Sequence, residues 1–347
     1  MSIKLFNQRF SINELWKMKW SLMRPPLHLG KDYNFSLNRL SQFLRSTHAW
    51  GLPPFLMIEP TSRCDMACPI CFVRDSKGKY PTGDMPLEQY KQIMDEVGGT
   101  LITLALWGYG EPLLNRNLPQ MISYAREMGV FTTVSTNAFS LDEEIADALI
   151  DSRLDYCIVS VDGASEETYA MYRSPGKFAR VVENIATLTK RKRARRSVTP
   201  FVNIQFIVMR GNEHEIPAMR KLAHELGADK LSLKKAWVFT KEEERTVLPS
   251  DPVYHLKIYS RELDRGICTR PWNTPFITWK GDVLVCCADF GCCALMGNVF
   301  GNGGFGAVWN SHRFRSFRVA MIKDINKIDI CRRCGAKNYK DGFVPLE

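Results

Sequence analysis

The sequence lacks both a membrane-spanning segment and a secretory signal. No run of about 18 uncharged apolar residues occurs in its 347 residues, which argues against a transmembrane helix. The N-terminus has no compact apolar stretch followed by a small-residue cleavage site, so a signal peptide is not indicated. We therefore expect a cytoplasmic protein in a reducing environment. In such an environment, its 11 cysteines indicate metal binding or redox chemistry rather than disulfide bonds.

The sequence also lacks the evenly spread positive charge of a nucleic-acid surface. Of the net charge of +10, residues 1–50 carry +6 and the run KRKRARR at 190–196 carries another +6, so the remainder is slightly negative. This run follows the apolar helical pattern FARVVENIATLT at 178–189, so we expect it to end a helix, where cations offset the helix dipole. Nucleic acid is therefore not an expected partner.

Two periodicities alternate through the middle of the chain. Short β-branched runs predict six strands, at 55–60, 101–108, 131–137, 156–162, 202–209 and 230–236. Helical patterns lie between them, at 87–98, 118–129, 142–152, 177–189 and 215–227. This repeat predicts an α/β fold with parallel strands, either an open partial barrel or a doubly wound sheet. In both, ligands bind at the carboxyl ends of the strands.

Composition divides the chain into four expected segments. They are a basic amphipathic segment at 1–50, the strand–helix repeat at 51–240, a linker at 241–266 and a cysteine-rich module at 267–347. In the first segment, NELWKMKWSLM at 13–23 places its apolar residues on one broad helical face. Such a helix either packs on the rest of the fold or lies on a membrane surface.

Three cysteines, Cys64, Cys68 and Cys71, directly follow the first predicted strand. Thiolates favour iron–sulfur clusters or zinc, but a structural zinc site would need a fourth ligand from elsewhere in the chain. Three cysteines at this spacing would instead leave one iron of a four-iron cluster without a protein ligand. An open iron of this kind can bind a substrate or cofactor directly.

This loop resembles that of the radical S-adenosylmethionine (SAM) enzymes, in which Cys-x3-Cys-x2-Cys follows the first strand of a partial (βα)6 barrel. The resemblance covers about residues 53–236, and it implies that the three cysteines hold a SAM-binding 4Fe-4S cluster. Four further stretches at or beyond strand ends match the family: GYGEP (108–112), STN (135–137), VSVDG (159–163) and YRSPGKF (172–178). They imply cofactor-binding roles for Gly108, Gly110, Glu111, Pro112, Ser135, Asn137, Ser160, Asp162 and Arg173.

The match departs from the family pattern at two positions. Tyr109 is inserted between the matching glycines, and Ile70 stands where the family usually has an aromatic residue, just before the third cysteine. The family implies an enzyme that cleaves SAM reductively to a 5′-deoxyadenosyl radical, which then abstracts a hydrogen from the substrate. It also implies an electron-donor partner such as a flavodoxin or a ferredoxin.

A second cysteine group stands near the C-terminus. Cys268, Cys286, Cys331 and Cys334 are spaced Cys-x17-Cys-x44-Cys-x2-Cys. Together with TPFITWKGDVLVCC at 274–287 they resemble the auxiliary-cluster module called SPASM, or its short form Twitch. The resemblance implies a small α+β module with one auxiliary 4Fe-4S cluster. Cys287 adjoins Cys286 and is the alternative ligand.

Four cysteines remain outside these two ligand sets. Cys157 lies within a predicted strand, where we expect a buried and inert thiol. Cys287 is the alternative auxiliary-cluster ligand to Cys286. Cys292 and Cys293 either fill a small loop or include a thiol that donates a hydrogen atom to a substrate radical, as in radical epimerases.

Three functions follow from these resemblances. The first is oxidation or epimerisation of a small molecule such as a sugar, a cyclitol or a lipid-linked glycan; the basic segment at 1–50 favours an anionic or membrane-associated substrate. The second is a maturase of a ribosomally made peptide or protein. Against it, residues 1–50 are too short for the winged recognition domain of such enzymes and lack its hairpin pattern. The third, a non-catalytic iron–sulfur scaffold or electron carrier, would not need GYGEP and STN.

Overall fold

The computed structural model describes residues 2–5, 8–11, 29–69, 71, 80–238, 241–257, 268–289, 291–301, 303–332 and 334. Ten strands form one sheet in the order β12-β11-β10-β3-β4-β5-β6-β7-β8-β9. Strands β1 (Ser2–Leu5) and β2 (Gln8–Ser11) form a separate antiparallel pair. The helix expected at 13–23 and the departure at Ile70 lie outside the described residues.

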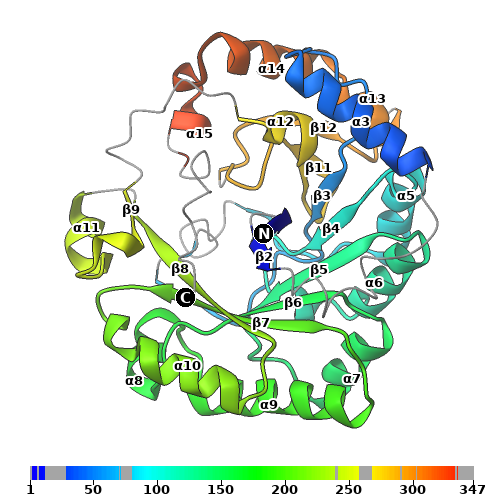
Figure 1. The fold of residues 1–347 in the computed structure, drawn as a ribbon. Helices are drawn as coiled ribbons and strands as arrows, with labels where there is room; N and C mark the ends of the chain where they lie inside the picture. The colour runs from blue at the N-terminus through cyan, green and yellow to red at the C-terminus, as the bar shows by residue number, and fades with distance from the viewer. Residues whose placement is uncertain are drawn as a thin grey trace.

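The centre of the sheet confirms the predicted parallel α/β architecture. Six parallel strands lie in chain order: β3 (Phe55–Ile58), β4 (Thr103–Leu106), β5 (Phe131–Thr136), β6 (Tyr156–Ser160), β7 (Phe201–Val208) and β8 (Lys230–Val238). The crossover helices are α5 (Leu87–Val97), α6 (Leu118–Glu127), α7 (Glu143–Asp151), α8 (Glu166–Tyr172), α9 (Phe178–Ala194) and α10 (Ile216–Glu225). Figure 1 shows these helices around the outside of a strongly curved sheet.

Alternating side chains give the sheet two different faces. Leu56 and Ile58 of β3 share one core cluster with helix residues such as Tyr90 of α5. Met57 of β3 and Ala105 of β4 point to the opposite face, where they pack with residues of the C-terminal module. Because successive strand residues face opposite sides, this second face is the inner face of the barrel.

The basic run at 190–196 ends helix α9, as its position after an apolar helical pattern predicts. Arg191 and Arg195 form ion pairs with Asp147 of α7. Lys192 Nζ lies 2.6 Å from an oxygen of Asp229. These cations therefore pack α9 against neighbouring elements at the helix terminus, where positive charge is favourable.

The C-terminal module continues the barrel sheet. Strand β10 (Phe276–Ile277) pairs in parallel with β3, and β11 (Asp282–Leu284) and β12 (Leu295–Asn298) follow as antiparallel neighbours. Helices α12 (Arg270–Asn273), α13 (Gly304–Trp309), α14 (His312–Asp324) and α15 (Asp329–Arg332) complete it. The pairing of β10 with β3 places the module beside the strand that leads into the three-cysteine loop.

Two further segments flank the barrel. The predicted linker contains α11 (Lys241–Val247) and β9 (His255–Lys257), and β9 adds a parallel strand beside β8. Helix α3 (Leu29–Phe43) belongs to the N-terminal segment and contacts α12, where Asn38 Nδ2 donates to Trp272 O.

Candidate active site and auxiliary cluster site

The three-cysteine loop begins six residues after β3 ends, at the carboxyl end of the sheet. The pKa of the Cys64 thiol is raised to about 12, mainly by burial and in smaller part by the nearby charges of Glu111, Asp65 and Cys71. Burial also raises the pKa of Cys68, with Cys71 among the charges that add to the effect. The loop therefore gathers the three thiols beside the carboxylates of neighbouring strand ends.

Glu111 organises the side of the loop near Cys64. Its carboxylate accepts hydrogen bonds from Leu113 N at 3.2 Å, Thr136 Oγ1 at 2.6 Å and Asn137 N at 2.8 Å. Burial raises the pKa of Glu111 to about 7, although these hydrogen bonds oppose the rise. Glu111 thus joins the ends of β4 and β5.

Asp65 links this network to the cysteine loop. It accepts hydrogen bonds from Asn137 Nδ2 at 2.8 Å and from Ser140 Oγ at 2.6 Å. The sequence motifs identify Asn137 but neither Asp65 nor Ser140. Asp65 follows the first cysteine directly, and that adjacency is the only sequence signal for it.

Arg173 and Asp162 form the opposite side of the site, near Cys68. Arg173 Nε donates to Asp162 Oδ2 at 2.7 Å, and Ile207 N donates to Asp162 Oδ1 at 2.7 Å. After burial, the Arg173 charge is the largest influence on the Cys68 thiol, and it lowers the pKa of that thiol. The structure thus brings Arg173 and Asp162 to the cysteine loop, and their role in binding a cofactor stays a prediction.

The glycines of GYGEP allow the loop after β4 to press against the cysteine loop. A Cβ atom on Gly110 would lie 2.4 Å from Thr61 O and 2.5 Å from Arg63 O, so only glycine fits without movement. Glu111 N donates to Arg63 O at 2.7 Å across the same contact. Pro112 begins a short 3-10 helix at Pro112–Leu114 that turns the chain away.

The two predicted serines lie in the strand ladder. Ser135 of β5 pairs in register with Ile158, and Ser160 ends β6 opposite Gln205. They therefore stand on the two strands that follow GYGEP in the sheet.

The residues at this site fit a thiolate-bound cluster with an amino-acid-like cofactor. Carboxylates and a buried arginine surround three thiols, and the buried hydroxyl of Tyr169 has no hydrogen-bond partner among the described residues. The charges that act on this hydroxyl include Arg173, Asp162 and Cys68, which places it at the same site. An unpartnered buried hydroxyl is costly and fits a site that a bound group completes.

No three His, Cys, Asp or Glu side chains in the described part of the chain come close enough to bind a single metal ion. A four-iron cluster takes one cysteine per iron, so its ligands stand farther apart than those of one ion.

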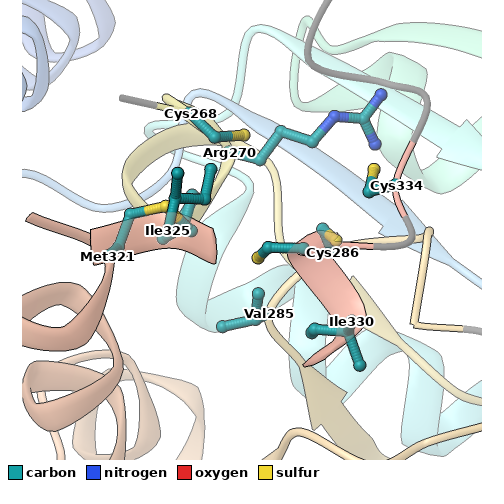
Figure 2. A pocket seen from close by; sticks show the side chains of 10 residues that line it. Cys268, Arg270, Val285, Cys286, Met321, Ile325, Ile330 and Cys334 are labelled. Atoms are coloured by element: carbon teal, nitrogen blue, oxygen red, sulfur yellow. The ribbon is translucent and has the colours of Figure 1, made fainter. Parts of the chain in front are cut away.

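The second cysteine group surrounds one pocket in the C-terminal module. Its lining includes Cys268, Cys286, Cys331 and Cys334, together with the apolar side chains of Val285, Met321, Ile325 and Ile330. Figure 2 shows Cys268, Cys286 and Cys334 around this pocket, with Arg270 extending toward Cys334. Four soft ligands within apolar walls fit a fully ligated iron–sulfur cluster.

The adjacent cysteines 286 and 287 face different surroundings. Cys286 lines the pocket, where Cys334 and Cys268 are among the groups that act on its thiol. Cys287 packs against the inner-face cluster of the barrel, and its Sγ accepts a hydrogen bond from Arg270 Nη1 at 2.7 Å. This arrangement favours Cys286 as the ligand.

A hydrogen-bonded group centred on Glu59 links the barrel to the C-terminal module, and its Glu59 and Tyr80 belong to none of the sequence motifs. Glu59 is fully buried after β3 and accepts hydrogen bonds from Tyr80 OH at 2.6 Å, Tyr109 N at 2.9 Å and Trp279 N at 3.1 Å. Burial raises the pKa of Glu59 to about 7. Tyr109 OH donates to Asp289 O at 2.8 Å. The inserted tyrosine thus connects the barrel to the module.

The remaining cysteines differ in their surroundings. Cys157 is fully buried on β6, as expected for a core thiol. Cys292 packs against the inner-face cluster beside Tyr109, whereas Cys293 is exposed. Of these two neighbours, Cys292 is therefore the one placed to meet a molecule inside the barrel.

Comparisons with known proteins match both parts of the chain. The Radical SAM superfamily matches residues 58–223, and an iron-sulfur cluster-binding domain called SPASM matches residues 268–335. The mycofactocin maturase MftC of Mycobacterium tuberculosis (strain ATCC 25618 / H37Rv) is 26% identical over 341 residues, which cover 89% of this chain and 84% of MftC.

Two other known proteins are similar to this chain, one over a shorter stretch of sequence and one in fold. The PqqA peptide cyclase of Bradyrhizobium diazoefficiens is 26% identical over 196 residues, which cover 54% of this chain and 48% of the cyclase. The structure of Streptococcus suis SuiB bound to precursor peptide SuiA superposes with a TM-score of 0.62 at 14% identity, covering 88% of this chain and 75% of SuiB. The likeness to SuiB shows the fold.

Proposed function

Because the chain belongs to the radical SAM superfamily and carries a SPASM domain, we propose that it is an enzyme that modifies a ribosomally made peptide or protein. The single observation that carries this proposal is the extent of the similarity to MftC, a maturase. That similarity runs through the barrel and the C-terminal module alike, whereas PqqA peptide cyclase matches over about half of each chain.

The structure removes one of the two sequence-based objections to a peptide substrate, the lack of a hairpin; the shortness of residues 1–50 still stands against the winged recognition domain. The sequence pattern predicts no hairpin in residues 1–50, but β1 and β2 pair in antiparallel register from Ser2↔Ser11 to Leu5↔Gln8. The alternation in these eight residues is too short to stand out from a basic, mixed sequence. The small-molecule reaction expected from the sequence thereby becomes the second candidate.

When bound, the cluster and SAM supply one-electron chemistry that removes a hydrogen atom from a substrate carbon. The residues proposed to hold the cluster are Cys64, Cys68 and Cys71. Glu111 and Asp65 fix the ends of β4 and β5 around the site, and the Arg173–Asp162 pair fixes the opposite side. In the module, Cys268, Cys286, Cys331 and Cys334 are proposed to hold the auxiliary cluster.

The placement of Cys292 supports an epimerase-type reaction as one form of this chemistry. Its thiol lies on the inner face with Tyr109 as a hydrogen-bonding neighbour. A thiol there would donate a hydrogen atom to the substrate radical and become a thiyl radical, which one electron from the external reductant and one proton from solvent return to the thiol. Cys293 is exposed and serves as the matched control.

Deuterium transfer tests the substrate class directly in a mixture of cell components. Extract from cells of the source organism grown in deuterated medium would be incubated anaerobically with the reconstituted enzyme, SAM and a reductant. Deuterium in the released 5′-deoxyadenosine, measured by mass spectrometry, marks the fraction that donates the hydrogen. We expect the donor to be macromolecular and to disappear after protease treatment. A small, protease-resistant donor would contradict the peptide proposal and support the second candidate.

The same system tests Cys292. With the identified substrate in deuterated water, we expect the native enzyme to place one solvent deuterium at a product carbon. Cys292→Ala would stop this incorporation, and Cys293→Ala would retain it. Equal incorporation by both variants would remove Cys292 from the mechanism while leaving the peptide proposal untouched.

A further inference from the structure

Helix α3 is amphipathic with its polar side turned inward. Its buried residues are Lys31, Asn34, Asn38 and Ser41. At about 100° per residue, the opposite side of the helix gathers Leu29, Tyr33, Ser36, Leu40, Phe43 and Leu44 within an arc of about 100°. We call the five apolar members of this set the α3 stripe. A surface helix of a globular protein normally turns such a stripe toward the core.

Specific hydrogen bonds hold the polar side of α3 against the protein. Lys31 Nζ donates to Met128 O at 2.8 Å, at the end of α6. Asn34 Nδ2 donates to Leu52 O at 3.0 Å, and Asn38 Nδ2 donates to Trp272 O in the C-terminal module at 2.5 Å. Because these bonds reach both the barrel and the module, the orientation of α3 is set by the fold.

The α3 stripe is consequently exposed. Phe43 is 81% exposed, Leu29 78% and Tyr33 67%, and Leu40 and Leu44 are each about half exposed. Trp50, just beyond the helix, is also exposed. Contiguous exposed apolar side chains of this kind mark an interaction surface.

The charge around the stripe indicates what it contacts. Residues 1–50 carry a net charge of +6, and among the exposed charged residues of α3 and the turn after it, Arg39 and Arg45 outnumber Asp32. A second copy docking through the same face would bring two such charges together. The sequence just before α3, LWKMKWSLMR at 15–24, combines tryptophans with basic residues, as interfacial membrane segments do.

We propose that the α3 stripe docks this protein on an anionic membrane surface. The apolar side chains of the stripe enter the acyl boundary, and the exposed Arg39 and Arg45 meet anionic headgroups. The contact is peripheral: none of the described helices combines the length and the apolarity that spanning a bilayer requires. This inference is independent of the reaction and of the substrate class proposed above.

Vesicle co-sedimentation of the full-length reconstituted enzyme tests the proposal. Vesicles of phosphatidylcholine alone would be compared with vesicles containing about one third phosphatidylglycerol. We expect binding to the anionic vesicles, weakening with added salt because screening removes the electrostatic part. Leu40→Glu with Phe43→Glu should lower the vesicle partition coefficient about tenfold or more. Each change replaces an apolar side chain that the membrane would bury with a charged one.

The matched control places the same charge change elsewhere. Val198 is 56% exposed and Val253 is 45% exposed, and both lie outside the N-terminal segment. Val198→Glu with Val253→Glu should bind vesicles nearly as well as the native chain. Light scattering and thermal unfolding would confirm that both double variants are folded and of unchanged mass.

Three outcomes would overturn the proposal. One is failure of the native chain to bind anionic vesicles at low salt. Another is an equal loss of binding in the control variant. The third is a native dimer that Leu40→Glu with Phe43→Glu converts to a monomer, because the stripe would then be covered by a second copy. Because vesicle binding needs no turnover, failure here leaves the proposed reaction untouched.

Discussion

The two cysteine sites of this chain use the same ligand atoms in contrasting surroundings. At the barrel loop, three thiols lie among buried charges: Glu111, Asp65 and the Arg173–Asp162 pair. In the module, four thiols share a pocket with apolar side chains and one arginine. The first arrangement offers polar groups to a further ligand, whereas the second encloses its contents. The difference teaches that surroundings, more than ligand type, distinguish the proposed SAM-cluster site from the proposed auxiliary-cluster site.

The largest effect should come from removing a thiol of the barrel loop. Cys64→Ala should lower reductive SAM cleavage by about a thousandfold or more, because a cluster with two protein ligands does not persist there. The measurement is 5′-deoxyadenosine formed per chain under anaerobic conditions. Cys293→Ala, an exposed thiol outside both sites, should retain activity. Retained SAM cleavage in Cys64→Ala would show that the three-cysteine loop does not hold the cluster that cleaves SAM.

A second test separates the adjacent cysteines of the module. The native enzyme should hold about eight irons per chain, and Cys286→Ala should hold about four, since the auxiliary pocket loses one of its four thiols. Cys287→Ala should keep about eight, because Cys287 faces the inner-face cluster. Anaerobic iron and sulfide counting measures both. The opposite result would exchange the roles of the two residues.

The charged pair at the barrel site should contribute strongly to stability. Asp162→Asn would leave Arg173 buried without its counter-charge, which should lower the free energy of unfolding by about 3–5 kcal/mol. The exposed pair Arg332–Asp329 is the control, and Asp329→Asn should cost less than about 1 kcal/mol. Urea unfolding of the cluster-free chains measures both. Equal effects would show that burial does not distinguish the two pairs.

The smallest effect concerns Glu59, which joins the two regions through Tyr109 and Trp279. Burial raises its pKa from 4.5 to about 7, so between these values the folded chain keeps a proton that the unfolded chain releases. The stability that Glu59 contributes is therefore fully present below pH 4.5 and is lost as the pH rises through about 7. Relative to Glu59→Gln, the native chain should lose up to about 3 kcal/mol across this window.

Urea unfolding at several pH values measures this difference. Glu225→Gln, which alters an exposed acid on α10, should leave the pH dependence unchanged. Parallel curves for the native chain and Glu59→Gln would mean that Glu59 titrates normally and does not couple the two regions through a held proton.

Much of the barrel was predictable because its signals are local. The run at 131–137 gives β5 at Phe131–Thr136, and the pattern at 87–98 gives α5 at Leu87–Val97. Strand and helix periodicity follow from which face of a short segment is buried, and neighbouring residues report this directly. The hairpin β1–β2 and strand β9 escaped prediction because these short strands lack the continuous apolar run that marks the equally short β3.

The residues of the candidate sites also fall into two groups, those that a local motif predicts and those that only distant partners identify. Cysteine spacing and GYGEP point to residues that stand close together in the chain and share one loop. Glu59, Asp65 and Tyr80 escaped because their roles depend on partners from other elements: Glu59 meets Trp279, 220 positions away. No spacing within a motif reports a contact of that range.

By itself, the sequence determined the superfamily, the two cysteine groups and the order of strands and helices, because these depend on local pattern and residue chemistry. Tertiary structure decided which of two adjacent cysteines lines the auxiliary pocket, because Cys286 lies in the pocket wall and Cys287 packs on the inner-face cluster. It also decided that β10 joins β3 and that α3 turns its apolar side outward. Both depend on hydrogen bonds between segments more than 90 residues apart, which only the folded chain brings together.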